Sequence, residues 1–201
     1  MILKENIRTI VKSQRHELLH FEKVIERDSL NQIELNVPFA VVIPGVRRCG
    51  KSTLLRQLAK KVNGFYYFNF EDPRAIKFDI EDFKKLNDVL LEEYGKQNYY
   101  FLDEIQNMQK WELFVRNLLD KNKHPVITGS NASLLSKELG TKLTGRHFDH
   151  HLFPFSYEEY LKFRKGESPL DKGRIAYANL LKNSLTVEQA SKKLGVDPVI
   201  V

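Results

Sequence analysis

Residues 41–55 read VVIPGVRRCGKSTLL, and this stretch decides the fold. An apolar segment comes first, then a loop bracketed by Gly45 and Gly50, then a helix start at Lys51. The spacing G-x-x-x-x-G-K-[ST] between a strand and a helix is the pattern of a phosphate-binding loop. The glycines allow backbone N–H groups to approach phosphate oxygens, and the positive end of the helix dipole points at the same anion.

Each position of this loop has an expected task at a bound nucleoside triphosphate. Lys51 brings a positive charge to the β- and γ-phosphates, and the Ser52 hydroxyl is a ligand for Mg²⁺. Thr53 is expected to reach the α-phosphate. The alternative interpretation is a glycine turn that matches the pattern by chance. The predicted nucleotide-binding residues are Gly45, Val46, Arg47, Arg48, Cys49, Gly50, Lys51, Ser52 and Thr53.

A second signal is the run YYFLDE at residues 99–104. A continuous apolar run is typical of a central parallel strand that is covered on both faces. Its carboxyl end is expected beside the phosphate loop, because ligands bind at this edge of open α/β sheets. Asp103 is then expected to hold Mg²⁺ through water. Glu104, which strand alternation directs the other way, is expected to polarise the attacking water.

Candidate phosphate-sensing residues follow further along the chain. The apolar run at residues 125–131 ends in Ser130 and Asn131, and either side chain is expected to hydrogen-bond the terminal phosphate or the water. Helix capping for a segment at 132–137 is the equally supported alternative. Arg146 is a candidate arginine finger for the site of a neighbouring subunit, or else a surface cation at the start of a strand.

The remaining pattern predicts alternating helices and strands. Three charged residues follow the second strand: Glu71, Asp72 and Arg74. They form either a group beside the metal-bound water and the nucleotide, or a polar turn. Ser156 and Glu159 have capping-box spacing at the start of a further helix. We expect helices over residues 2–27, 52–62, 80–94 and 109–120, and strands over residues 39–43, 65–70, 99–104, 125–131 and 147–153.

Composition is that of a globular protein with one α/β domain and a small appendage: 201 residues, 42% hydrophobic and 29% charged. No apolar run reaches the length of a membrane span, and the N-terminus lacks a secretory core. The single cysteine, Cys49, suits a reducing compartment, so a cytoplasmic location is expected. The net charge of +6 fits either a nucleic-acid partner or solvated helix faces, because basic and acidic residues are mixed.

The last part of the chain changes in character. A polar linker at residues 164–169 precedes a segment, residues 185–198, that resembles the first helix and turn of a helix-turn-helix. The sequence ends at Val201 before a recognition helix, and half of this motif cannot read a groove. A structural role or a truncation is therefore expected for the tail rather than DNA binding.

Together these segments resemble the AAA-type ATPases of the archaeal and bacterial "ATP-binding protein" family, close to the STAND group of signalling NTPases. The resemblance covers residues 20–165 and implies a sheet of strand order 5-1-4-3-2, Mg-ATP binding and slow ATP hydrolysis. Family members continue into a long C-terminal domain that has no counterpart in this pattern. The matching pieces are residues 45–53, 68–72, 102–106 with Trp111, 128–131, 145–146 and 154–160.

The sequence thus predicts a three-layer α/β/α P-loop NTPase fold with a short helical tail. Its expected parts are an N-terminal helix and lead-in (1–36), an AAA-type ATPase domain (37–165) and a linker with the tail (166–201).

The expected activity is Mg²⁺-dependent hydrolysis of the acid anhydride bond of ATP. An ATP-binding switch with little hydrolysis, or a nucleic-acid-associated ATPase, is the alternative, and a homo-oligomer or protein partner is expected. The predicted catalytic residues are Glu104, Lys51, Ser130, Asn131 and Arg146, and the predicted metal ligands are Ser52 and Asp103.

Overall fold

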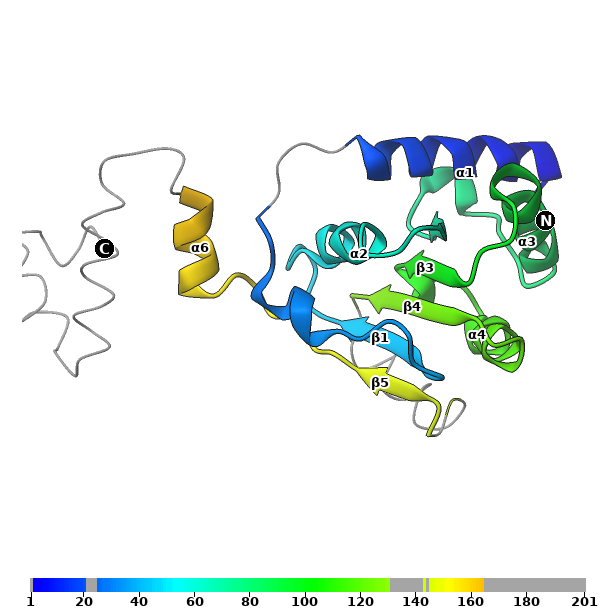
Figure 1. Cartoon of the computed structure of the whole chain (residues 1–201). Coiled ribbons are helices and arrows are strands. Elements are labelled where there is room, and N and C mark those ends of the chain that lie inside the picture. The colour runs from blue at the N-terminus through cyan, green and yellow to red at the C-terminus, as the bar shows by residue number, and fades with distance from the viewer. Residues whose placement is uncertain (1, 21–24, 131–142, 144, 165–201) are drawn as a thin grey trace, which may run out of the picture. The chain divides into compact units, whose positions relative to one another are not determined.

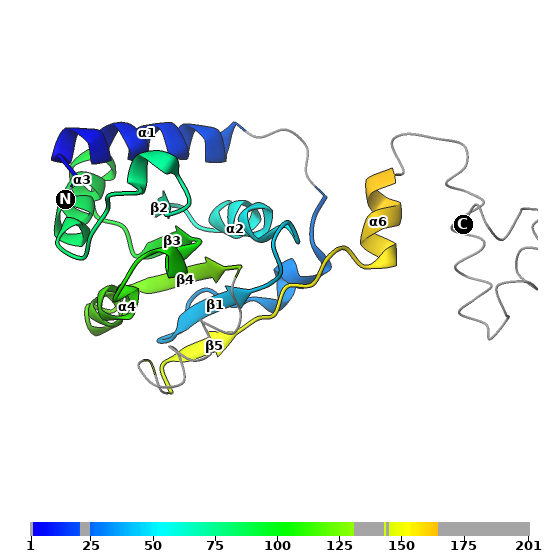
Figure 2. The same ribbon diagram turned by 180° about the vertical axis from the view of Figure 1, so that it is seen from behind.

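The computed structural model describes residues 2–20, 25–130, 143 and 145–164. The chain forms two compact units, Met1–Pro154 and Phe155–Val201. Figure 1 labels the main helices and strands, and Figure 2 shows them from behind. The described elements are α1 (Lys4–Leu19), the 3-10 helix η1 (Asp28–Gln32), β1 (Ala40–Pro44), α2 (Lys51–Ala59), β2 (Phe65–Asn69), η2 (Pro73–Ala75), α3 (Asp82–Tyr94), β3 (Tyr99–Asp103), η3 (Ile105–Asn107), α4 (Trp111–Asp120), β4 (His124–Gly129), β5 (His147–Asp149) and α6 (Tyr157–Arg164).

Five parallel strands form one sheet in the order β2-β3-β4-β1-β5. This is the predicted order 5-1-4-3-2 read from the opposite edge, so the predicted fold class is confirmed. In β1, Val41 pairs with Val126 and Pro44 pairs with Gly129. Because the strands are parallel, the carboxyl ends of β1, β3 and β4 lie together, and the loop after β1 starts at this edge (Figure 1).

Helices cover both faces of the sheet and create two apolar cores. One core joins the strands to α1, α3 and α4, and the other joins them to α2 and the segment around η1. Side chains alternate between the two along β1: Val42 faces the first core, whereas Val41 and Ile43 face the second. This double cover explains why the strands are continuous apolar runs, and it makes the three-layer arrangement.

Helix α1 lies along the open edge of β2 (Figure 2). The Gln14 side chain accepts a hydrogen bond from Asn69 N at 2.9 Å and donates one to Asn69 O at 3.0 Å. Arg15 donates to Phe65 O at 2.5 Å. These contacts satisfy backbone groups that would otherwise be open to another strand.

The predicted first helix is too long at its C-terminal end. Helix α1 ends at Leu19, and residues 25–27 are not helical. Their backbone groups hydrogen-bond to α2 instead. The Gln57 side chain donates to Ile25 O at 2.5 Å and accepts from Arg27 N at 3.2 Å.

Other predicted boundaries agree to within a few residues, apart from the last strand. Strand β5 covers only His147–Asp149, although the N–H groups of His150 and Leu152 still donate to Val42 O and Pro44 O at 2.8 Å. The capping box is confirmed: Ser156 N donates to Glu159 Oε2 at 2.9 Å, and Glu159 N to Ser156 Oγ at 3.1 Å.

The predicted helix at 132–137 and the tail at 166–201 lie outside the described residues. Within the described part of the chain, no helix combines the length and the apolar character that crossing a membrane requires.

Candidate functional site

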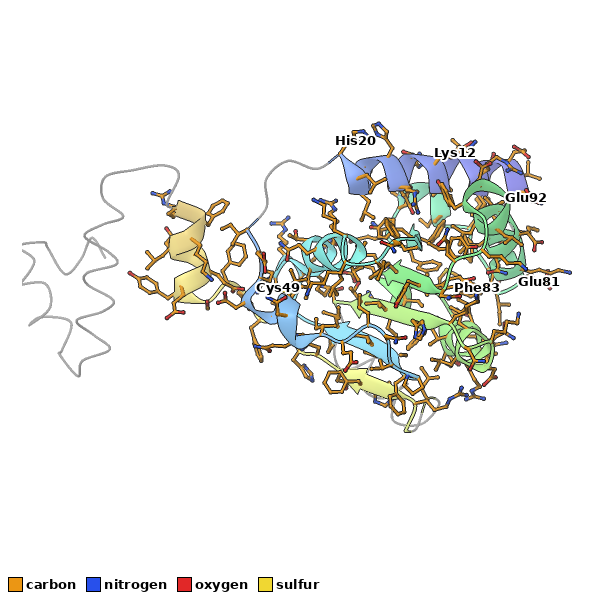
Figure 3. The ribbon with its side chains drawn as sticks, in the orientation of Figure 1. Lys12, His20, Cys49, Glu81, Phe83 and Glu92 are labelled. Atoms are coloured by element: carbon orange, nitrogen blue, oxygen red, sulfur yellow. The ribbon has the colours of Figure 1, made fainter. Side chains whose placement is uncertain are left out.

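The loop between β1 and α2 is fixed at both ends, and Cys49 marks it in Figure 3. Gly45 N donates to Gly129 O at 3.3 Å, and Leu54 N donates to Gly50 O at 2.9 Å as α2 begins. Gly50 has a φ of 96°, in the left-handed region that favours glycine. A Cβ atom on Gly45 would lie 2.5 Å from Leu152 O and 2.8 Å from Cys49 Sγ. The structure therefore explains why glycine stands at both of these motif positions.

Arg27 connects the loop to its surroundings, although no sequence pattern predicts a role for it. Its side chain donates to Cys49 O at 2.7 Å and to Phe153 O at 2.8 Å. The residue is buried, and its Nη1 atom lies 3.0 Å from the place of a Cβ on Gly50. In the sequence, Arg27 is one basic residue among charged neighbours; only the fold brings it to the loop.

Lys51 opens α2 and turns its ammonium group back into the loop. Its Nζ atom donates to Gly45 O and Val46 O, both at 3.1 Å, and lies 3.2 Å from Glu104 Oε1. The side chain is only 4% exposed. Three oxygen atoms thus satisfy the three N–H donors of a buried cation, so phosphate oxygens can bind only by replacing some of them.

Asp103 ends β3 in full burial beside the loop. Its carboxylate accepts hydrogen bonds from the Thr128 hydroxyl, from the Tyr67 hydroxyl at 3.3 Å and from the Ser52 hydroxyl. Burial raises the pKa of Asp103 above its ordinary value, more than these hydrogen bonds lower it. The two predicted metal ligands, Ser52 and Asp103, are therefore in direct contact.

Glu104 leaves the strand with an unusual backbone. Its φ of 50° and ψ of 46° are left-handed, and its N–H donates to Thr128 Oγ1 at 3.0 Å. The backbone of Glu104 therefore lies outside the strand, and strand alternation is not what sets the direction of this side chain. Such a conformation in a non-glycine residue costs of the order of 1 kcal/mol or more and persists only where the surroundings hold it.

Three donors hold the Glu104 carboxylate toward the loop. Oε1 faces Lys51, while Oε2 accepts from Gln106 Nε2 at 2.7 Å and from Ser130 N at 2.9 Å. Burial alone would raise the pKa of Glu104, but the hydrogen bonds from Gln106 and Ser130 and the charge of Lys51 lower it below its ordinary value. The carboxylate is thus charged and oriented. Gln106 and Thr128 complete the group, although the predicted site omits both.

Two hollows adjoin these residues and share Arg47, Ser52 and Glu71. The first measures about 360 Å³ and the second, on the side of α1, about 720 Å³. Arg47 and Glu71 form an exposed ion pair of 2.9 Å between the loop and the end of β2. The first hollow is lined by Arg47, Arg48, Gly50, Lys51, Ser52, Thr53, Glu71 and Glu104.

The acidic and basic residues after β2 mainly form a turn. Asp72 accepts from Arg74 N at 2.9 Å, from Arg74 Nη2 at 2.7 Å and from Gln14 Nε2 at 3.0 Å. The Arg74 guanidinium, with the Gln14 hydrogen bond, lowers the pKa of Asp72 to about 2. Between the two interpretations of this segment, the contacts favour the polar turn for Asp72 and Arg74. Glu71 alone borders the smaller hollow.

Two predicted residues stand apart from this group. Arg146 lies at the amino end of β5, where its carbonyl accepts from Ala40 N at 3.0 Å and its side chain pairs with Asp120 at 2.8 Å. This is the sheet edge opposite the phosphate loop, so Arg146 does not join the site of its own chain. Its role toward a neighbouring subunit stays a prediction. Asn131 lies outside the described residues.

Comparison with protein families gives one match over most of the chain. A family model described as an AAA domain matches residues 38–161. The chain is 38% identical over 168 residues to the uncharacterized protein MJ1544 of Methanocaldococcus jannaschii, covering 83% of this chain and 37% of that protein. An uncharacterized protein of Haemophilus influenzae is 37% identical over 140 residues, with 65% and 35% covered. The chain spans about a third of the length of these relatives.

Two solved structures are also similar. The Walker-type ATPase PABY2304 of Pyrococcus abyssi has a TM-score of 0.49 at 17% identity, covering 85% of this chain and 71% of that one. PCH-2 of C. elegans has a TM-score of 0.44 at 14% identity, covering 88% and 47%.

Proposed function

Because this chain belongs to the family of AAA domains, we propose that it binds Mg-ATP and hydrolyses the bond between the β- and γ-phosphates. One juxtaposition carries the proposal. Lys51 Nζ lies 3.2 Å from the Glu104 carboxylate, and Ser52 hydrogen-bonds the Asp103 carboxylate next to it. The start of α2 and the end of β3 would thus supply a cation for phosphate, two oxygen ligands for a metal and a charged base.

The residues fit Mg²⁺. A hydroxyl and a carboxylate are hard oxygen ligands, the kind that this ion takes from proteins while it keeps several waters. Asp103 is a buried carboxylate whose pKa is raised, so a nearby cation would stabilise its charged form. Ser52 and Asp103 would hold the ion, which when bound neutralises charge on the phosphate oxygens.

The chain's own groups account for the remaining steps. Backbone N–H groups of the loop after Gly45 bind the phosphates, while Gly45 N keeps its bond to Gly129 O. Lys51 exchanges its loop carbonyls for phosphate oxygens. Glu104 orients a water and takes its proton as the water attacks the γ-phosphorus in line, and ADP leaves with the electrons of the broken bond. Gln106 and the Ser130 N–H hold Glu104 Oε2, so that Oε1 faces the loop.

We further propose Ser130 and Asn131 as contacts of the terminal phosphate, and Arg146 as a contribution to the site of a neighbouring copy. The position of Arg146 at the far edge of the sheet supports a role between chains over one within its own. Hydrolysis then depends on assembly, and its specific rate rises with protein concentration.

Substitution of Glu104 by glutamine tests the hydrolysis. Glu104→Gln keeps the shape of the side chain and removes the base, so we expect ATP to bind within about threefold of the parent affinity while turnover falls at least about 100-fold. Release of phosphate under saturating ATP and titration calorimetry give the two quantities. Glu81→Gln, an exposed acid labelled in Figure 3, is the matched control. Equal ATPase rates for Glu104→Gln and the parent would remove Glu104 from the mechanism.

A second candidate function is a nucleotide-dependent switch with little hydrolysis. The observation that favours it is the engagement of Glu104, which three donors hold at once. Single-turnover hydrolysis with ATP bound stoichiometrically distinguishes the two. A bound ATP that stays intact over many minutes supports the switch, whereas conversion to ADP supports the enzyme.

A further inference from the structure

Three connections that enter the sheet at its amino-end edge carry lysines. They run from α2 to β2, from α3 to β3 and from α4 to β4, and these three strands are neighbours in the sheet. The edge is opposite to the one that holds the phosphate loop. We call this surface the amino-end lysine face. Its lysines are Lys60, Lys61, Lys96, Lys121 and Lys123.

The three connections contact one another. Gly64 abuts Gln97, because a Cβ on Gly64 would overlap the end of the Gln97 side chain. Lys123 Nζ donates to Gln97 O at 2.9 Å and to Asn98 Oδ1 at 2.8 Å. His124 N donates to Asn98 O at 2.9 Å. The lysines of the face, scattered in the sequence, thus belong to one continuous surface.

Among the described residues, no carboxylate pairs with these lysines. Lys61 and Lys123 are held by carbonyl and amide oxygens, and none of the five lysines forms an ion pair within the described part of the chain. Asp120, next to Lys121 in the sequence, is already paired with Arg146 at 2.8 Å.

The contrast with α1 is clear. Three of its four lysines and arginines, Lys4, Arg8 and Lys12, are paired with Glu92 and Glu93 of α3. Lys12 and Glu92 are labelled in Figure 3. The five lysines of the face are thus cations without a carboxylate partner among the described residues.

A hollow of about 360 Å³ lies between the first two connections. Lys61 and Lys96 line it together with the amide side chains of Asn63, Gln97 and Asn98. Ammonium and amide N–H groups are donors, and the oxygens of a phosphate are acceptors with negative charge. The lining of this hollow therefore suits phosphate groups.

We propose that the amino-end lysine face binds the phosphate backbone of duplex DNA. Adjacent strands are about 4.8 Å apart, so the three connections span about 10 Å. Each strand of duplex DNA carries one phosphate per about 3.4 Å of axis, hence about three over this length on the strand that faces the protein, so five lysines are enough to contact them. Contacts of this kind hold and orient the protein without reading sequence.

Other anionic partners fit the face less well. Single strands bind where aromatic rings are open to stacking, but Tyr99 is half-buried and already stacks on His124 with 5.0 Å between ring centres. Double-stranded RNA carries the same phosphate charge but is recognised largely through its 2′-hydroxyl groups, and the RNA duplex in the experiment below distinguishes the two. The large exposed apolar side chains of the described chain lie outside the three connections, so the face offers none for a membrane surface.

The experiment measures binding of a 5′-fluorescein-labelled duplex of about 20 base pairs by anisotropy, without nucleotide, over a salt series. The test variant is the double substitution Lys96→Gln and Lys121→Gln, since both side chains are exposed. The matched control is the double substitution Lys77→Gln and Lys110→Gln, which are exposed on connections leaving the carboxyl ends of β2 and β3. An RNA duplex of the same length, poly-glutamate and phosphatidylserine vesicles serve as competing partners.

We expect the test variant to bind at least about tenfold more weakly at low salt, with a salt slope shallower by about 2, and the control to match the parent. Equal binding by the test and control variants overturns the proposal. So does absence of duplex binding by the parent, or equal or tighter binding to the RNA duplex, the polypeptide or the vesicles. The ATPase rate of the test variant should equal that of the parent, so the outcome is independent of the proposed hydrolysis.

Discussion

At the residue scale, the site consists of polar groups that already satisfy one another. Lys51 has three oxygen partners, and Glu104 has three donors. Binding of a nucleotide is therefore an exchange of partners, in which the free energy gained from phosphate contacts is reduced by the contacts that are lost. This predicts moderate ATP affinity that depends strongly on the few residues holding the loop in place.

Gly45 is the first of these residues. Alanine there would place Cβ 2.5 Å from the backbone oxygen of Leu152, so the loop must move, which costs about 1–3 kcal/mol. We expect Gly45→Ala to weaken ATP binding at least about tenfold in titration calorimetry and to lower Tm by several degrees. Gly64→Ala is the control, because its Cβ would meet only the flexible end of Gln97. Unchanged ATP affinity in Gly45→Ala would show that the loop tolerates the shift.

Arg27 is the second. Arg27→Met keeps much of the side-chain length and removes the hydrogen bonds to Cys49 O and Phe153 O, each worth about 1.5–3 kcal/mol for a charged donor. We expect the Kd for ATP to rise at least about tenfold in calorimetry, even at a temperature where the variant is fully folded. Arg8→Met, which removes ion pairs on α1, should leave the Kd unchanged. A lower Tm with an unchanged Kd would limit Arg27 to a structural role.

The sequence alone predicts the site residues that belong to a short contiguous motif. Gly45 to Ser52 and the pair Asp103-Glu104 belong to such patterns, and their juxtaposition follows from the parallel sheet. Arg27 and Thr128 act through contacts across the fold, which no local pattern shows. Gln106 and Thr128 belong to the matching pieces 102–106 and 128–131, but the sequence assigned neither of them a role. The left-handed backbone of Glu104 could not be predicted from strand alternation, because it depends on those same contacts.

At the scale of elements, α1 and the turn after β2 act together. Gln14 hydrogen-bonds both backbone groups of Asn69 and also the carboxylate of Asp72, while Arg74 pairs with the same carboxylate. These contacts fix the end of β2, which borders the larger hollow. The predicted helix of residues 2–27 extended too far because its apolar spacing continues, whereas Arg27 and Ile25 are bound to α2 and the loop.

The charge of Asp72 makes this arrangement dependent on pH. Its pKa is lowered to about 2, below the ordinary value of 3.8, so its contribution to stability is present above 3.8 and is lost as pH falls through about 2. We expect Asp72→Asn to reduce the free energy of unfolding in urea by about 1–2 kcal/mol at neutral pH. The difference should shrink between about pH 5 and about pH 2.5. A difference that is constant with pH would contradict the assignment.

At the scale of the whole molecule, our two proposals assign different tasks to the two ends of the strands. The carboxyl ends carry the phosphate loop and the Asp103-Glu104 pair, and the amino ends carry the lysine face. The overall fold was predictable because two apolar patterns alternate along the sequence. Continuous apolar runs predict buried parallel strands, and apolar residues at helical spacing predict amphipathic helices. The lysine face was not predictable, because its residues come together only when β2, β3 and β4 are neighbours.

The central claim is that Lys51, Ser52 and Asp103 hold a triphosphate together with its metal ion. Titration calorimetry with a slowly hydrolysed ATP analogue, with Mg²⁺ and with EDTA, tests it most directly. We predict a Kd at least about tenfold lower with Mg²⁺ for the parent, loss of that difference in Asp103→Asn, and loss of binding in Lys51→Ala. Binding by Lys51→Ala as tight as that of the parent, or a parent affinity unaffected by Mg²⁺, would contradict the account.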